Sequence, residues 1–278
     1  MGKIFGFLKR CVIVATLTVF IIGVLFTASH LIGHSFVRNY DGRIETPVVF
    51  YEHPTTKRKI VFVATVHVAE KKYYSRLQEI VASLDGYSVL FEMVSPLSKK
   101  EKEGLGEVGV KAYEKMQNDF SIIRHAVDIM QLQYQTDGIV YDSSWVNTDI
   151  SMYELISSMD EPGNAKKFCL PDDFEEEELK WLINFAARNI EVMYSCIRIN
   201  NYCRSFFEET KSVVVGGRNE VAVQGIKEYL EQGNVVTIWG AAHFPGIDAQ
   251  IRQMGFREIR REWISAYQVR GYSFFDLF

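Results

Sequence analysis

The chain has 278 residues, of which 47% are hydrophobic and 24% charged, with a formal net charge of −4 and a pI near 5.9. This composition is typical of a globular protein with a substantial core, and it excludes a disordered chain. The negative net charge and acidic pI give no sign of the basic surface that nucleic-acid-binding proteins use, so we expect no nucleic-acid partner.

The beginning of the chain departs from this average. Residues 1–10 carry three basic residues and no acid, and residues 11–37 contain no Asp, Glu, Lys or Arg. As a helix, the apolar residues 11–28 would span about 27 Å, close to the hydrocarbon thickness of a bilayer. We therefore predict a cytoplasmic stub and membrane anchor at residues 1–37, and one domain at residues 38–278. A cleaved signal peptide is the alternative.

The N-terminal basic residues indicate the orientation of this anchor. Positive flanks stay on the cytoplasmic side of a membrane. We therefore expect a single-pass membrane protein with a cytoplasmic N-terminus and an extracytoplasmic main domain. Arg38 and Arg43 weaken this interpretation, and Asp41 partly offsets them.

Strand-like and helix-like patterns alternate through the rest of the chain. The periodicity of apolar residues and the turn-forming residues between them define these elements. In chain order they are two strands within 46–67, a helix at 69–86, a strand at 87–94, helices within 99–135, a short strand at 137–142, a capping-box helix from Ser151, a helical stretch at 171–209, a helix at 219–233, a strand at 234–239, a helix at 243–255 and a strand at 256–269.

Two distant segments share one layout. A strand ends in ATVH at residues 64–67 and in GAAH at residues 240–243, and each time a helix and a further strand follow. The sequence thus predicts an α/β fold whose central mixed sheet comes from two pseudo-repeated strand-xxxH-helix-strand halves with a helical insertion, preceded by one transmembrane helix. Either an internal duplication or coincidence explains the match.

Polar residues at the ends of these strands are candidates for a site. Open α/β sheets bind ligands at the C-terminal ends of parallel strands, and His67 and His243 occupy that place. A lone histidine there is more often a loop residue, but two in matching positions favour a shared site. Glu92 ends an apolar strand, and its burial would require a cation or hydrogen-bond donors. It either faces water from an edge strand or lies beside His67.

Three more residues have two interpretations each. Arg218 and Asn219 are either an exposed arginine and a helix cap, or part of the site. Asp149 is either a loop residue ahead of the helix at Ser151 or a second carboxylate of the site. Two histidines with one or two carboxylates suit Mn, Co or Zn. The chain has no HExxH, GxSxG or Walker motif, so it is not an ordinary zincin.

Three blocks, at residues 62–94, 216–226 and 235–247, resemble the TraB/GumN/Tiki superfamily, which is related to the erythromycin-esterase-like and ChaN-like proteins. The signature is a pair of GxxH motifs, a glutamate ending the strand after the first, and an Arg-Asn or Arg-Asp pair before the second. Ala64 replaces the first glycine. Because alanine does not readily adopt positive φ, we expect a different turn before His67.

The resemblance implies two pseudo-repeated α/β halves and, as in the Tiki branch, a metal-dependent protease activity. We therefore predict a membrane-anchored, metal-dependent hydrolase with a peptide or small-molecule substrate. Its metal would lower the pKa of a bound water and polarise the scissile carbonyl. Arg218 would stabilise the oxyanion or hold a substrate carboxylate, with Asn219 positioning it. The expected metal ligands are His67, His243, Glu92 and Asp149, and the expected catalytic residues are Glu92, Arg218 and Asn219.

Two other functions remain open from the sequence. In the first, the protein is an esterase-like hydrolase without a metal, in which a histidine acts as general base. In the second, it is a non-enzymatic module that binds a ligand such as haem or a signalling peptide.

Overall fold

The computed structural model describes residues 36–158 and 216–269. The predicted membrane anchor and the helical stretch at 171–209 lie outside the described residues. Within the described part of the chain, no helix combines the length and the apolar character that a membrane crossing requires.

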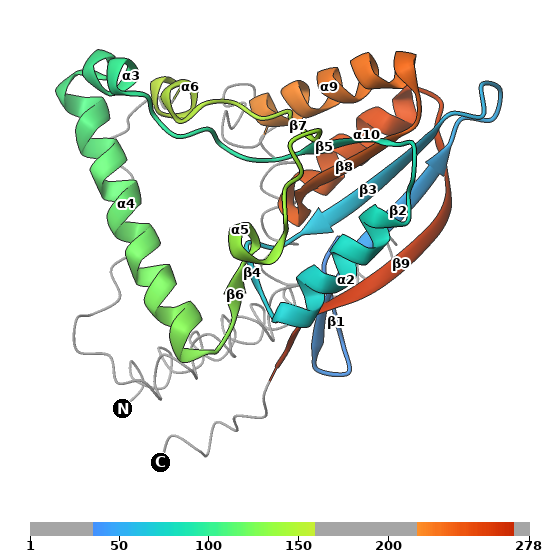
Figure 1. Ribbon diagram of the computed structural model, residues 1–278, viewed down its shortest axis with the longest axis horizontal. Coiled ribbons are helices and arrows are strands. Elements are labelled where there is room, and N and C mark those ends of the chain that lie inside the picture. Colours follow the sequence, from blue (N-terminus) through green and yellow to red (C-terminus); the bar gives the residue numbers. More distant parts are fainter. Residues whose placement is uncertain (1–35, 159–215, 270–278) are drawn as a thin grey trace, which may run out of the picture.

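A mixed sheet of seven strands forms the centre of the molecule (Figure 1). Its strands are β1 (Arg38–Tyr40), β2 (Arg43–Glu52), β3 (Lys59–Thr65), β5 (Ser88–Phe91), β7 (Val146–Asn147), β8 (Val235–Gly240) and β9 (Arg257–Gln268). They follow the order β1-β2-β3-β8-β5-β7, and β9 also pairs with β2. The strands β3, β8, β5 and β7 are parallel, whereas β2 is antiparallel to β1, β3 and β9. The predicted α/β class and central mixed sheet are confirmed.

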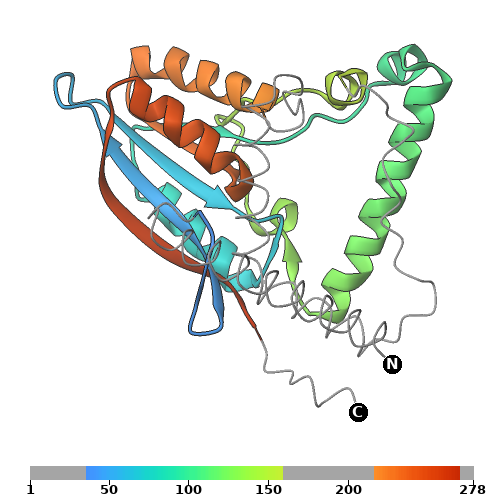
Figure 2. The ribbon, with the colours of Figure 1, turned by 180° about the vertical axis from the view of Figure 1, so that it is seen from behind.

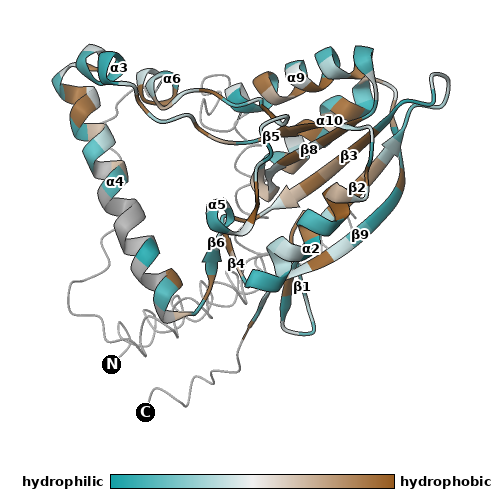
Figure 3. Ribbon diagram, in the orientation of Figure 1, coloured by the Kyte–Doolittle hydropathy of each residue, from teal (hydrophilic) through white to brown (hydrophobic). Residues whose placement is uncertain are grey.

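Helices cover both faces of this sheet. They are α2 (Lys71–Ala82), α9 (Arg218–Gln232) and α10 (Phe244–Gln253). Helix α2 packs on the face that carries Val61 and Val63 of β3, whereas α9 and α10 pack on the face that carries Phe62 (Figure 2). Because both faces are buried, β3 and β8 are nearly continuous apolar runs (Figure 3).

The two halves of the sheet wind in opposite directions. From β3 the chain passes through α2 to β5, beyond β8, and from β8 it passes through α10 to β9, beyond β3 and β2. Right-handed crossovers that run in opposite directions require helices on opposite faces, as observed. The neighbours β3 and β8 are therefore a topological switch point, and ligands of α/β sheets bind outside the carboxyl ends of such strands.

The predicted helical insertion lies between the two halves. Its elements are α3 (Lys99–Gly104), α4 (Gly106–Ile129), β6 (Gln133–Tyr134), α5 (Gln135–Gly138) and α6 (Met152–Ser157). A short strand of the first half, β4 (Val68–Ala69), pairs with β6. The helix α4 extends away from the sheet and shares a separate small core with α6 (Figure 1). The predicted capping box is confirmed, because the Ser151 side chain accepts from Glu154 N and the Glu154 side chain accepts from Ser151 N.

The short strand predicted at residues 137–142 is wrong. The segment contains the end of α5 and irregular backbone instead. Gly138 lies so close to Tyr74 of α2 that a Cβ there would be 2.3 Å from the Tyr74 ring. The glycine thus permits a tight contact with α2, and this contact replaces pairing with the sheet.

Candidate active site

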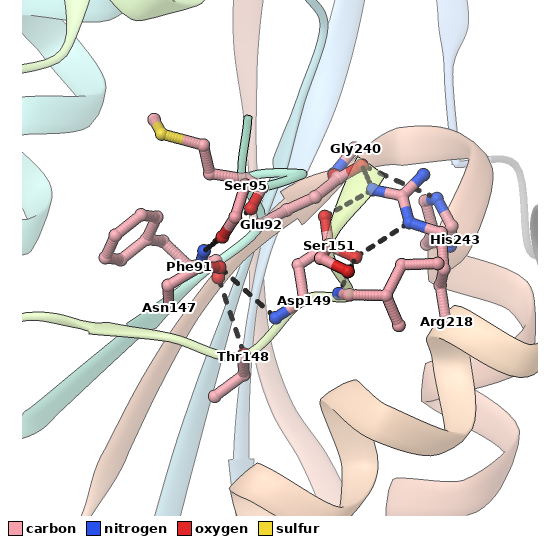
Figure 4. Close-up of polar contacts among 12 residues, drawn as sticks. Phe91, Glu92, Ser95, Asn147, Thr148, Asp149, Ser151, Arg218, Gly240 and His243 are labelled. Carbon is pink, nitrogen blue, oxygen red and sulfur yellow. Dashed lines mark hydrogen bonds and ion pairs between the residues drawn. The ribbon is translucent and has the colours of Figure 1, made fainter. Parts of the chain in front are cut away.

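Charged and polar side chains meet at the carboxyl ends of β5 and β8 (Figure 4). Glu92 directly follows β5, Gly240 ends β8, and Arg218 begins α9. Glu92 is only 7% exposed, and β5 lies between β8 and β7. The interpretation of Glu92 as a water-facing residue of an edge strand is therefore wrong.

Both carboxylate oxygens of Glu92 accept strong hydrogen bonds. Oε1 accepts from Nη2 of Arg218 at 2.5 Å, and Oε2 accepts from the backbone N–H of Gly240 at 2.5 Å. Burial alone would raise the pKa of Glu92, but the neighbouring His243 ring, the Arg218 guanidinium and the Gly240 N–H hold it below its usual value. Glu92 is therefore a buried, ionised carboxylate at neutral pH.

Arg218 joins Glu92 to a second carboxylate. Figure 4 shows its guanidinium between Glu92 and Asp149, with Nε donating to Oδ1 of Asp149 at 2.8 Å and Nη2 to Oδ2 at 2.6 Å. The side chain of Asp149 is 0% exposed, because β7 pairs with β5 and Thr148 N donates to Phe91 O. The interpretations of Arg218 as exposed and of Asp149 as a plain loop residue are both wrong.

Asn219 holds the ring of His243. It lies in the first turn of α9, where Gly217 is the N-cap residue, so the prediction of a cap at Asn219 is wrong. Nδ1 of His243 lies 2.7 Å from Oδ1 of Asn219. An amide oxygen only accepts, so Nδ1 carries the proton and Nε2 keeps its lone pair. That Nε2 lies 3.6 Å from Oε1 of Glu92.

His243 is neutral in this environment. It is 5% exposed, and burial lowers its pKa, although Glu92 acts in the opposite direction. The ring of Trp239 packs edge-on against it at 5.0 Å between centroids. A neutral imidazole with one nitrogen fixed and the other free is suited to accept a proton or to bind a metal ion.

The glycine of the GAAH motif provides space for Glu92. Gly240 has a φ of −53°, which any residue adopts. A Cβ on it would lie 3.0 Å from Oε2 of Glu92. The expected reason for glycine in this motif, a positive φ, is therefore wrong. Ala64, its counterpart in the first motif, is a core residue of β3, where its methyl group packs.

Sequence analysis missed Trp239 and Gly246. A Cβ on Gly246 would lie 2.2 Å from Nδ2 of Asn219, so its missing side chain makes room for that amide. Gly246 has negative φ and sits in the first turn of α10, after Pro245. A glycine inside a helix needs no positive φ. Its presence in the sequence is therefore the one signal that another group packs closely against the helix at that position.

His67 lies at the same edge of the sheet, in a different setting. It follows β3 and is exposed, and its carbonyl oxygen accepts from Gln135 N at 2.9 Å. It is close enough to lower the pKa of both Glu92 and His243. The structure thus brings all three predicted residues to the end of β3, β5 and β8, but only Glu92 and His243 are in the buried network.

The donor atoms fit a metal ion in part. Ligand atoms of a tetrahedral ion with bonds of about 2.1 Å lie about 3.4 Å apart, close to the 3.6 Å between His243 Nε2 and Glu92 Oε1. Both oxygens of Asp149 bind Arg218, so Asp149 fits less well. Within residues 36–158 and 216–269, no group of three or more His, Cys, Asp or Glu is already set to hold a metal. Among the predicted ligands in the described residues, His67 is the one whose side chain is not already held in the buried network.

Comparison with known proteins gives one relationship. The family model for the TraB/PrgY/gumN family matches residues 140–259, a range that contains Asp149, Arg218, Asn219 and His243. No curated protein and no solved structure matches the chain. The resemblance predicted from the sequence is confirmed over residues 140–259, where the chain is similar to the TraB/PrgY/gumN family.

Proposed function

We propose that this protein is a metal-dependent hydrolase of amide or ester bonds, with peptides as the first substrate class to test. One observation supports this function above the others. The free Nε2 of neutral His243 lies 3.6 Å from the ionised carboxylate of Glu92, at a topological switch point of the sheet. This arrangement offers a proton acceptor and a negative charge to one water molecule.

The residues of the site have separate roles in this proposal. His243 Nε2 takes a proton from water as the oxygen forms a bond to the carbonyl carbon, and it returns that proton to the leaving nitrogen or oxygen as the scissile bond breaks. Glu92 stabilises the imidazolium that exists between these steps. Asn219 and Arg218 are positioning residues, since they fix the His243 ring and the Glu92 carboxylate.

The metal ligands in this proposal are His67 and Glu92, because the Nε2 lone pair of His243 accepts the proton and cannot also bind the metal. Their nitrogen and oxygen donors suit Mn, Co or Zn. A divalent ion held there would supply a lower pKa for its bound water and polarise the carbonyl group. The exposed position of His67 allows its side chain to approach Glu92, which is fixed by buried contacts.

The test uses the full-length chain purified in mild detergent, because residues 1–37 are predicted to contain a membrane anchor. Turnover of a fluorogenic peptide panel and of chromogenic esters is measured before chelation, after chelation, and after addition of Mn, Co or Zn. We expect chelation to abolish turnover and one of the metals to restore it. His243→Ala should lower turnover at least about 100-fold.

A matched control is available at the opposite end of the sheet. Nδ1 of His53 accepts from Thr55 N and Thr56 N in the β2–β3 turn, and asparagine can accept in the same way. His53→Asn should therefore keep full turnover. Equal turnover by His243→Ala and His53→Asn would contradict the proposed hydrolase.

A metal-independent hydrolase is the second candidate. It is favoured by the free Nε2 of neutral His243, which can accept a proton from water without a metal. Activity that survives exhaustive chelation and still depends on His243 would assign water activation to the imidazole alone. Stoichiometric binding of haem or a peptide without any turnover would instead support a ligand-binding module.

We also propose that residues 1–37 anchor the protein in a membrane, with the remaining domain extracytoplasmic. The apolar, uncharged run at residues 11–28 supports this proposal. Extraction of membranes with alkaline carbonate should leave the full chain in the pellet, and release into the supernatant would contradict the anchor.

A further inference from the structure

A second set of polar side chains reaches the site from the α2 side of the sheet. Gln135 links two of its members, because its backbone N–H donates to His67 O at 2.9 Å and its side-chain Nε2 donates to the Tyr141 hydroxyl at 3.1 Å. Helix α5, which Gln135 begins, lies beside the carboxyl end of β3 (Figure 1). These contacts connect Tyr141 to the His67 segment.

Tyr141 is also close to Glu92. Its ring packs against Phe91, the residue before Glu92, at 4.8 Å between centroids. The charge of Glu92 acts on the Tyr141 phenol. Since Phe91 and Glu92 point to opposite faces of the sheet, Tyr141 approaches the end of β5 from the face opposite Arg218 and His243.

The hydroxyl of Tyr141 has a proton to donate. A phenol carries one O–H and two acceptor lone pairs, and Gln135 occupies a lone pair through its amide N–H. The phenolic proton therefore does not take part in that bond. Phenols titrate near pH 10 in water, so the proton is present at neutral pH.

Packing fixes this hydroxyl in place. Gln135 is only 5% exposed, and Trp145 packs edge-on against the Tyr141 ring at 6.0 Å between centroids. Meanwhile Nε and Nη2 of Arg218, the group predicted to stabilise an oxyanion, donate to Glu92 and Asp149. A hydrolytic site needs a donor for the oxyanion that develops on the carbonyl oxygen.

We propose that Tyr141 donates its hydroxyl hydrogen bond to the carbonyl oxygen of the substrate and to the oxyanion that develops from it, and that Gln135 is the residue that positions Tyr141. The inference rests on the proposed hydrolase function. It assigns the α9/α10 side of the site to water activation and the α2 side to the carbonyl oxygen.

The main test compares Tyr141→Phe with the unaltered full-length chain on one substrate of the panel. We expect kcat to fall about 100-fold, as for the loss of one oxyanion donor, while KM changes less than about 2-fold. The unfolding midpoint falls because Gln135 Nε2 loses its acceptor, so kcat is measured where both proteins remain folded. The matched control is Tyr87→Phe, because Tyr87 precedes β5 at the end of the strand away from the site. This variant should have the kcat and KM of the unaltered chain. An unchanged kcat in Tyr141→Phe overturns the inference.

A second variant tests the role of Gln135. In Gln135→Glu the carboxylate only accepts, so it takes the Tyr141 proton away from the substrate. We expect kcat to fall as in Tyr141→Phe, and we expect no further fall when Gln135→Glu is added to Tyr141→Phe. Additive losses would show that Gln135 acts without Tyr141 and would overturn the positioning role.

The two proposals fail in different ways. If the unaltered chain turns over nothing, or if His243→Ala keeps full activity, the hydrolase function is contradicted and this inference with it. If His243→Ala is inactive while Tyr141→Phe keeps its kcat, the hydrolase stands and only the role of Tyr141 is lost.

Discussion

His243 and His67 each follow one strand of the parallel pair β3–β8, in motifs with the same strand-xxxH layout, GAAH and ATVH. Their surroundings differ much more. His243 is buried, with Nδ1 fixed by Asn219 and Nε2 beside Glu92. His67 is exposed, and its carbonyl oxygen is bonded to Gln135 N.

This difference follows from what packs against each strand end. Helix α9 begins at the end of β8 and brings Arg218 and Asn219 there, whereas α5 and the Tyr141 segment lie at the end of β3. The side chains on the α9 side are thus fixed before a ligand binds. This arrangement requires the burial of three charged groups, those of Glu92, Asp149 and Arg218. The His67 side is open to solvent, so its histidine is free to move toward a ligand.

The largest expected effect tests the buried charges. Arg218→Met leaves Glu92 and Asp149 buried without their cation, and we expect it to destabilise the protein by about 3–5 kcal/mol in urea unfolding. Arg76→Met is the control on α2, where the exposed Arg76–Glu79 ion pair contributes less than about 1 kcal/mol. Equal losses in both variants would contradict an organised α9 side.

A rescue separates lost charge from lost packing. Adding Glu92→Gln and Asp149→Asn to Arg218→Met removes the unpaired negative charges and keeps the shapes of both side chains. Part of the stability should return, because neutral amides are less costly to bury than carboxylates. A further loss would indicate that the contacts of the Arg218 stem, and not its charge, hold the site together.

The second prediction compares the histidines directly. His243→Ala leaves Oδ1 of Asn219 without its donor in a buried place, at a cost of about 1–3 kcal/mol of unfolding free energy. His67→Ala removes an exposed side chain and should change stability by less than about 0.5 kcal/mol. Similar effects on the urea midpoint would show that the two histidines are structurally equivalent, as their motifs suggest.

Much of this site could be predicted from the sequence. The strand patterns and the xxxH motifs place His67 and His243 at the carboxyl ends of strands, and the charge of Glu92 on an apolar strand indicates buried partners. The convergence of Glu92 and His243 follows from these features, since β5 and β8 pair in the sheet. The resemblance adds Arg218 and Asn219 as further members of the site.

The partners of Asp149 and Tyr141 could not be predicted in this way. Asp149 reaches Arg218 because β7 docks beside β5, and β7 is only the two residues Val146–Asn147, too short for a periodic pattern. Tyr141 belongs to a segment whose apolar residues predicted a strand, whereas Gly138 turns the chain against α2. Both contacts depend on long-range packing, which local periodicity does not encode.

The third prediction concerns the leading residue of each motif. In Gly240→Ala the new Cβ would push against Oε2 of Glu92, so we expect kcat on the panel substrate to fall about tenfold, which corresponds to about 1.4 kcal/mol. Ala64→Gly removes a buried methyl group and costs about 1 kcal/mol of stability, with kcat unchanged. A full kcat in Gly240→Ala would contradict the view that this glycine provides space for Glu92.

The smallest expected effect is the pH dependence of stability on the His243 side. Burial lowers the pKa of His243, so the unfolded chain binds a proton more readily than the folded one. The stabilising contribution is therefore complete above the unfolded pKa, about 6.5, and is lost as the pH falls toward the folded pKa. For one group, the unfolding free energy cannot change by more than about 1.4 kcal/mol per pH unit.

Urea unfolding at pH 8, 7, 6 and 5 measures this dependence. The unfolding free energy should decline as the pH falls in the unaltered chain and in His67→Gln, but this decline should be absent in His243→Gln. If His243→Gln keeps the decline, another group is responsible for it, and the burial of a neutral His243 no longer distinguishes the two sides of the site.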